Sequence, residues 1–204
     1  METALESVTP LLAQMGFKKR SGWLFTTELE PDVLGWLGLN RATEHRAKGE
    51  VEVNPVVGVR FQRVERLVAE LRGEKFHGYI PPTINRPIGY LLPEAKYRGW
   101  IFGPGRANDT AKDMVSIVEK YGLPFMRSIR GLSELLQMLE ARYGFDHLIM
   151  YRRPVTCFLA GDTAQARTLV EESLAAIGVR EDLAAAEFRK FAAAFLNRLS
   201  SVPP

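Results

Sequence analysis

The spacing of apolar residues changes twice along the first third of the chain. From residue 3 to residue 15 they recur every three or four positions, which predicts a helix that ends at Gly16. They then alternate with polar residues, which predicts strands joined by short links into an antiparallel meander. The predicted strands cover residues 23–29, 33–40 and 51–61. Helical spacing returns over residues 61–72, and Gly73 is expected to end that helix.

Prolines complicate two of these segments. Pro55 lies within the third strand and removes a backbone donor, so we expect that strand at a sheet edge or at a bulge. Residues 74–106 are rich in proline, glycine and aromatic residues and show no long periodicity. Within them, residues 88–92 and 98–102 are predicted to pair as a late hairpin.

Helical spacing dominates the second half of the chain. A helix starting near residue 108 is expected to close at Gly122 and Pro124, and the stretch 146–160 is expected to be a helix broken near Pro154. Further helices are predicted over residues 132–143, 162–177 and 181–199.

Strands in the first half and helices in the second predict an α+β fold. We expect an antiparallel sheet of four or five strands covered by helices, with a helical C-terminal portion. No flexible linker separates the halves. The prediction is therefore one compact domain over residues 1–204, with a sheet-forming part at about 1–105 and a helical part at about 106–204.

Composition indicates a globular protein. Hydrophobic residues make up 46% of the 204 residues and charged residues 25%. The N-terminal METALESVTP lacks the basic flank and apolar core of a signal peptide, and no run approaches the roughly 18 apolar residues that span a bilayer. With a single cysteine, these features favour a cytoplasmic location.

Catalytic and metal-binding patterns are weak in this sequence. Cys157 lies in the apolar stretch VTCFLAG and is interpreted as a core residue. His45, His77 and His147 each lack a second ligand at metal-binding spacing. The sequence therefore predicts no catalytic residue, no metal and no cofactor, and it favours a protein that is not an enzyme.

Two segments suggest anion binding. Gly103-Pro104-Gly105-Arg106 follows a predicted strand and precedes a helix, where exposed amides attract anions. Pro104 offers no N–H, so a plain strand-to-helix turn is favoured. Lys18, Lys19 and Arg20 form a basic cluster near Trp23, a combination used by single-strand binders, although the aromatic side chains are more readily core residues.

Local motifs resemble those of an uncharacterised bacterial family. Leu11-Leu12, Gly16-Phe17-Lys18-Lys19 and the following Trp23 and Phe25 resemble its opening helix, GFKK segment and aromatic strand. Two later segments, Trp100-Ile101-Phe102 and Tyr121-Gly122-Leu123-Pro124-Phe125, resemble its W-x-F strand and LPF turn. Members of the family have no agreed activity, but such domains often act as accessory or immunity proteins beside bacterial toxins. The resemblance therefore implies a protein partner.

These observations favour a non-enzymatic protein-binding module, and the resemblance implies the immunity type that inhibits a toxin domain. Aromatic residues and arginine dominate interface energetics, so the candidate surface is segment 77–106. Its candidate partner-binding residues are Tyr79, Arg86, Tyr90 and Arg106. The alternative is a nucleic-acid or phosphate-ligand binder that uses Lys18, Lys19, Arg20 and Arg106. An enzyme with a novel site in segment 77–106 is the third hypothesis.

Overall fold

The computed structural model describes residues 2–42, 44 and 46–201. The chain divides into two compact units, and each unit combines two separate segments. The first unit comprises the residues up to Arg60 together with Asn85–Arg130, and the second comprises Phe61–Ile84 and the residues from Gly131 onward. These limits differ from the predicted division into a sheet-forming part and a helical part near residue 105. The single compact domain stays a prediction, and each unit is described by itself below.

A six-stranded antiparallel sheet forms the centre of the first unit, which confirms the α+β class. The strands follow the order β1-β2-β3-β4-β5, and β6 also pairs with β4. Their bounds are β1 (Lys18–Lys19), β2 (Leu24–Glu30), β3 (Val33–Ala42), β4 (Val51–Phe61), β5 (Ile84–Pro87) and β6 (Trp100–Phe102). The predicted meander corresponds to β2, β3 and β4. Phe25 of β2 and Leu37 of β3 are register partners on one buried face, and β4 is buried along its whole length.

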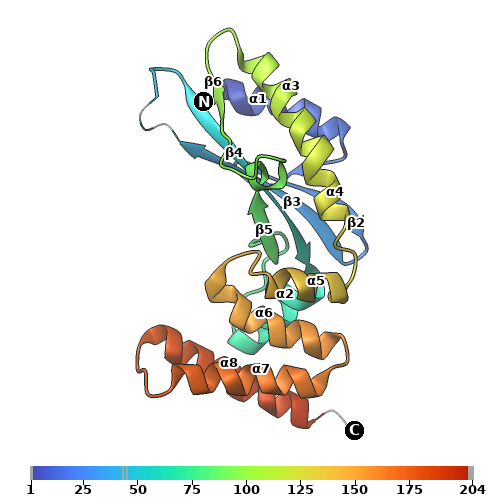
Figure 1. Cartoon of the computed structure of the whole chain (residues 1–204), viewed down its shortest axis with the longest axis vertical. Coiled ribbons are helices and arrows are strands. Elements are labelled where there is room, and N and C mark those ends of the chain that lie inside the picture. Colours follow the sequence, from blue (N-terminus) through green and yellow to red (C-terminus); the bar gives the residue numbers. More distant parts are fainter. Residues whose placement is uncertain (1, 43, 45, 202–204) are drawn as a thin grey trace. The chain divides into compact units, whose positions relative to one another are not determined.

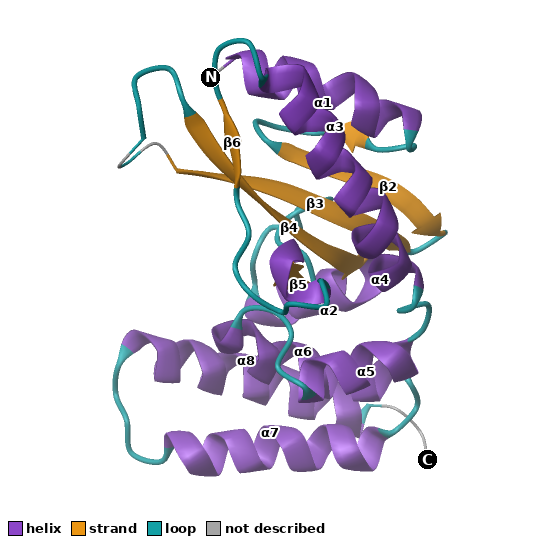
Figure 2. Cartoon of the chain, turned by 45° about the horizontal axis from the view of Figure 1, so that its top comes forward, coloured by secondary structure: helices purple, strands orange, loops and turns teal. Residues whose placement is uncertain are grey.

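Helices cover one face of this sheet. Figure 2 shows α1 (Glu2–Gln14) and α3 (Ala107–Ile117) lying side by side on it, and the two helices are in contact. The first helix ends as predicted, because Gly16 adopts a left-handed conformation with φ of 83°. Val8 and Leu12 of α1 are completely buried, so the amphipathic pattern of the helix forms the core on this side of the sheet.

Two expectations about the strands are wrong. Residues 88–91 form the 3-10 turn η1 (Ile88–Leu91), and β6 pairs with β4 instead of with this segment. Of the two places expected for Pro55, the sheet edge is wrong, since β4 pairs with β3, β5 and β6. Pro55 is accommodated just beyond the three β4 residues that pair with β6. There the Asn54 side chain donates to the Arg98 carbonyl oxygen at 2.6 Å.

The helix after β6 does not close where the sequence predicts. α3 continues into a π-helical turn, η2 (Val118–Gly122), and then into α4 (Leu123–Arg127). Gly122 has ordinary helical angles, and Pro124 lies in the first turn of α4, where its missing N–H costs little. Both residues therefore continue the helical path in a new register instead of ending it.

The second unit consists of helices. They are α2 (Gln62–Arg72), α5 (Leu132–Glu140), α6 (Asp146–Leu159), α7 (Thr163–Ile177) and α8 (Leu183–Ser200). α6 contacts α2, α5 and α7, and Figure 1 shows α7 and α8 as an adjacent pair. The predicted break at Pro154 is wrong, because α6 runs through this buried proline. Gly73 ends α2 in a left-handed conformation as predicted.

Aromatic side chains of α6 and α8 pack together in the core of the second unit. Phe188, Phe191 and Phe195 of α8 are completely buried, and the Tyr151 ring of α6 packs edge-on against Phe191 with centroids 4.9 Å apart.

Within the described residues, no helix of either unit has the length and apolar character needed to cross a membrane.

Candidate functional site

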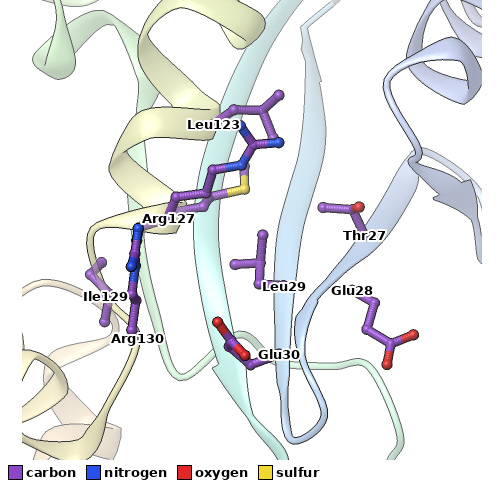
Figure 3. A pocket seen from close by; sticks show the side chains of 9 residues that line it. Thr27, Glu28, Leu29, Glu30, Leu123, Arg127, Ile129 and Arg130 are labelled. Atoms are coloured by element: carbon purple, nitrogen blue, oxygen red, sulfur yellow. The ribbon is translucent and has the colours of Figure 1, made fainter.

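A groove of about 330 Å³ lies in the first unit, between the end of β2 and the segment that contains α4. Figure 3 shows its lining side chains. One wall comes from β2, the other from α4 and the three residues after it. The lining consists of Thr27, Glu28, Leu29, Glu30, Leu123, Met126, Arg127, Ile129 and Arg130.

The apolar floor of the groove depends on a glycine. A Cβ atom at Gly35 on β3 would lie 2.8 Å from Cγ2 of Thr27 and 3.0 Å from Sδ of Met126. Such approaches are too close for a real side chain, so Gly35 permits Met126 to pack directly on the sheet. Leu29, half-buried on β2, extends the apolar surface into the open part of the groove.

The π-helical turn η2 determines where the second wall begins. Gly122 at its end lies against β4, since a Cβ atom there would be 3.1 Å from Cγ1 of Val57. π-Helical turns are rare and occur frequently at functional sites, because they redirect the residues that follow. Here the turn is followed at once by α4, so that Leu123 and Met126 face the sheet while Arg127 lies at the rim.

The second wall of the groove carries two exposed arginines. Nε of Arg130 donates a hydrogen bond to the carbonyl oxygen of Arg127 at 3.1 Å, which holds the two residues together. Within the described parts of the chain, neither guanidinium forms an ion pair with a carboxylate. Arginine stays cationic at every physiological pH, so this wall presents permanent positive charge.

The opposite wall carries acidic residues that a β-bulge points in different directions. Glu28 pairs with Leu34 and Glu30 with Val33, so the register of β2 shifts between the two glutamates. A bulge interrupts the alternation of side chains and can re-aim one of them. In Figure 3 Glu30 points toward the wall that carries the arginines, whereas Glu28 points away from it.

The arrangement is suited to recognition. Guanidinium groups bind carboxylates or phosphates through paired N–H donors, and the apolar floor of Leu29 and Met126 can receive an aliphatic or aromatic side chain. Glu30 supplies an acceptor for a donor on the same ligand. A surface that combines arginine with apolar residues is typical of the centre of a protein interface.

The structure distributes the predicted partner-binding residues over several places. Arg86 and Tyr90 lie together in the first unit, with the guanidinium 5.6 Å from the ring centroid. Arg106, also in that unit, pairs with Glu50 at 3.2 Å. Tyr79 belongs to the second unit, where its ring contacts that of His77.

Segment 77–106 as a whole is partly core and partly surface. Trp100 and Phe102 of β6 are buried, whereas Tyr90 and Tyr97 are exposed. The Tyr97 hydroxyl donates to Oε1 of Glu52 at 2.9 Å, and partial burial together with this hydrogen bond raises the pKa of the tyrosine. The aromatic density of the segment therefore reflects packing as well as exposure.

The basic cluster is divided between the two faces of the sheet. Lys18 pairs with Thr26, whose hydroxyl oxygen accepts a hydrogen bond from Nε of Arg20 at 2.8 Å. Lys18 and Arg20 therefore share one face, and Lys19 lies on the other. The two lysines are exposed and form no ion pair within the described residues.

The GPGR segment forms the strand-to-helix turn that the sequence favours. Gly105 has φ of 75°, Arg106 precedes the first residue of α3, and its N–H donates to the Gly103 carbonyl oxygen at 3.2 Å. Glu50 pairs with Arg106 beside this turn and places negative charge near the helix start.

Cys157 is buried on α6, as expected for a core residue. Burial raises the pKa of its thiol, which disfavours the thiolate. Among the described residues, no group of three or more histidine, cysteine, aspartate or glutamate side chains is placed to hold a metal ion. His45 lies outside the described residues.

Comparison with known proteins gives no relative: no family model, no curated protein and no solved structure matches this chain. The candidate site therefore depends on its own geometry. Arg127, Arg130 and Glu30 were not singled out as partner-binding residues from the sequence, because β2 and α4 are far apart along the chain. The neighbouring Gly122-Leu123-Pro124-Phe125 segment was singled out from the sequence, and it lies at the π-helical junction where the second wall begins.

Proposed function

We propose that this chain is a protein-binding module, not an enzyme, and that the groove between β2 and α4 receives a segment of its partner. The observation that carries the proposal is the pair of exposed arginines, Arg127 and Arg130, beside an apolar floor. Among the residues that the structure describes, neither forms an ion pair with a carboxylate. Unpaired guanidinium groups at an apolar groove favour a partner segment that presents a carboxylate beside an apolar side chain.

The position of the groove supports the same proposal. Its walls combine a π-helical junction, a close helix–sheet contact at Gly35 and a bulge at Glu30. The π-helical junction and the bulge depart from regular helix and strand geometry, and such departures are common where side chains are positioned for function. Inhibition of a bacterial toxin is the specific form of the proposal, and it rests on the resemblance of the GFKK and LPF segments to proteins of that kind.

Affinity capture from a lysate of the native host tests the proposal. The bait is the intact chain, compared with the double variant Arg127→Glu/Arg130→Glu. The control bait, Arg142→Glu/Arg167→Glu, reverses two exposed arginines of the second unit, each of which forms a weak ion pair with an acid four residues further along the chain. We expect a stoichiometric protein with the wild-type and control baits, resistant to nuclease, and its loss with the groove variant. Equal capture by all three baits would refute the groove as the binding site.

Nucleic-acid or phosphate-ligand binding is the second candidate function. It is favoured by the exposed Lys18 and Lys19, which lack ion-pair partners in the described structure, and by the neighbouring Arg20. Binding of a fluorescent single-stranded oligonucleotide or of inorganic phosphate would then weaken steeply as salt rises, because released counterions drive such association. Binding that ignores salt, or that survives Lys18→Glu/Lys19→Glu, would exclude this function.

A further inference from the structure

The outer edge of β2, on the side away from β3, is only partly covered. β1 pairs with Phe25 and Thr26 alone, whereas β3 pairs with β2 from Leu24 to Glu30. Within the described sheet, the outer edge of β2 therefore lacks a neighbouring strand beyond Thr26. This uncovered stretch lies at the groove, because all four residues from 27 to 30 belong to the groove lining.

The hydrogen-bonding pattern shows which backbone groups point to the outer edge. The Leu39 N–H of β3 donates to the Trp23 carbonyl oxygen at 2.9 Å. Bonded pairs recur at every second residue of an antiparallel ladder, so up to the bulge the odd-numbered residues of β2 face β3 and the even-numbered ones face outward. The Arg20 N–H, which donates to the Leu24 carbonyl oxygen at 2.9 Å, fits this alternation. The N–H and C=O of Glu28 therefore point outward, beyond the last pair with β1.

The backbone of Glu28 is the part of this residue that faces the groove. Glu28 lines the groove, yet Figure 3 shows its side chain pointing away from the wall that carries the arginines. Thr27 and Leu29 approach Gly35 on the opposite face of the sheet, which α4 covers. The groove therefore joins two features, an uncovered strand edge and a wall with two arginines.

An extended segment of a partner matches both features. A strand added to a sheet edge gains affinity from main-chain hydrogen bonds and specificity from alternate side chains. On the face that α4 covers, its side chains would lie beside Leu29, in the groove that Arg127 and Arg130 border. An apolar side chain suits Leu29. A carboxylate suits the guanidinium groups, which form no ion pair with an acid among the described residues.

A second copy of the chain fits this edge poorly. Pairing two β2 edges would bring Glu28 and Glu30 of one copy against the same residues of the other. Like charges directly opposite each other destabilise neighbouring strands, so the glutamates favour a partner of different sequence.

We propose that the partner segment binds as an added β-strand in line with β1. Its backbone pairs with the N–H and C=O of Glu28, and it directs an apolar and an acidic side chain, two residues apart, into the groove. This inference rests on the proposed function of the groove, and it adds the conformation and the side-chain pattern of the segment that binds there.

Glu28→Pro tests the pairing, because it removes the outward N–H without removing a hydrogen bond to β3. The matched variant is Glu28→Ala, which lacks the same carboxylate and keeps the N–H. The protein captured by the wild-type chain is purified, and its affinity for both variants is measured by isothermal titration calorimetry. We expect Glu28→Pro to bind it about tenfold more weakly than Glu28→Ala, because a buried carbonyl oxygen of the partner loses its donor.

Amide hydrogen exchange, followed by NMR in the wild-type chain, gives a second measurement that does not depend on the folding of Glu28→Pro. The Glu28 N–H should exchange at least about tenfold more slowly in the complex than in the free chain. Equal affinity of a folded Glu28→Pro and Glu28→Ala, or an unchanged exchange rate, would overturn the strand pairing. If Arg127→Glu/Arg130→Glu still abolishes binding in that case, the groove itself stands as the binding site. A wild-type chain that captures no protein would overturn both proposals.

Discussion

A buried ion pair in the second unit allows the sharpest test of the structure. Arg152 of α6 is 1% exposed and Glu65 of α2 is 6% exposed. Nε of Arg152 lies 2.8 Å from Oε1 of Glu65, and Nη2 donates to Oε2 at 3.1 Å. Nη1 donates to the carbonyl oxygen of Thr83 at 2.9 Å, so both terminal nitrogens of the guanidinium donate hydrogen bonds.

Removing one member of this pair should be costly. Arg152→Met removes the guanidinium that faces the buried Glu65 carboxylate, and Glu65→Leu removes the carboxylate that faces the buried guanidinium. Either change should lower the free energy of unfolding by about 3–5 kcal/mol. The double variant Glu65→Leu/Arg152→Met removes both charges together, so it should be more stable than either single variant. The expected coupling between the two sites is about 2 kcal/mol or more.

Urea unfolding followed by far-UV circular dichroism measures these differences. Arg153→Met is the control, because this neighbouring arginine is 31% exposed and pairs with Glu140 at 3.3 Å near the surface. Its loss should cost less than about 1 kcal/mol. The reasoning fails if Arg152→Met is as mild as Arg153→Met, or if the double variant loses the sum of the two single costs.

Further substitutions test other parts of the structure. Gly35→Ala should lower the unfolding free energy by about 1–3 kcal/mol, measured by thermal denaturation, because the new Cβ would lie too close to Thr27 and Met126. Asp162→Ala should cost about 1 kcal/mol in urea unfolding, since it removes the N-cap of α7. Because burial raises the pKa of Cys157, its alkylation rate in the native protein should keep rising with pH beyond the range of an exposed thiol. The Asp182 pKa is lowered by its hydrogen bond from Arg180, so its contribution to stability is present above the ordinary carboxyl pKa and is lost as pH falls through the lowered value. An NMR titration in which Asp182 titrates like a free carboxyl would contradict this.

Local signals in the sequence predicted most of the helices and the central strands. Gly73 ends α2, and Asp162 caps α7 by accepting from the Gln165 N–H, because each effect involves residues within one helical turn. The alternation over residues 51–61 predicted β4 with its observed bounds. These features depend on residues that are neighbours in the chain.

The errors concern long-range pairing and proline. The β4 residue Val51 pairs with Phe102 of β6, which lies 51 residues further along the chain, so no local pattern indicates that partner. Pro55 and Pro154 occur inside regular elements because tertiary packing outweighs the lost hydrogen bond, a balance that periodicity does not record. The groove was missed for a related reason, since Glu30 and Arg127 meet only when α4 packs on the sheet.

Titration of the captured partner against three forms of the chain tests the central proposal most directly. Isothermal titration calorimetry would compare the wild-type chain, Arg127→Glu/Arg130→Glu and the control Arg142→Glu/Arg167→Glu, which carry the same change in charge. We predict that the groove variant weakens the partner's affinity by at least about tenfold while the control leaves it unchanged. An affinity that the groove variant leaves intact, or that both variants reduce equally, would contradict the assignment of the groove as the binding site.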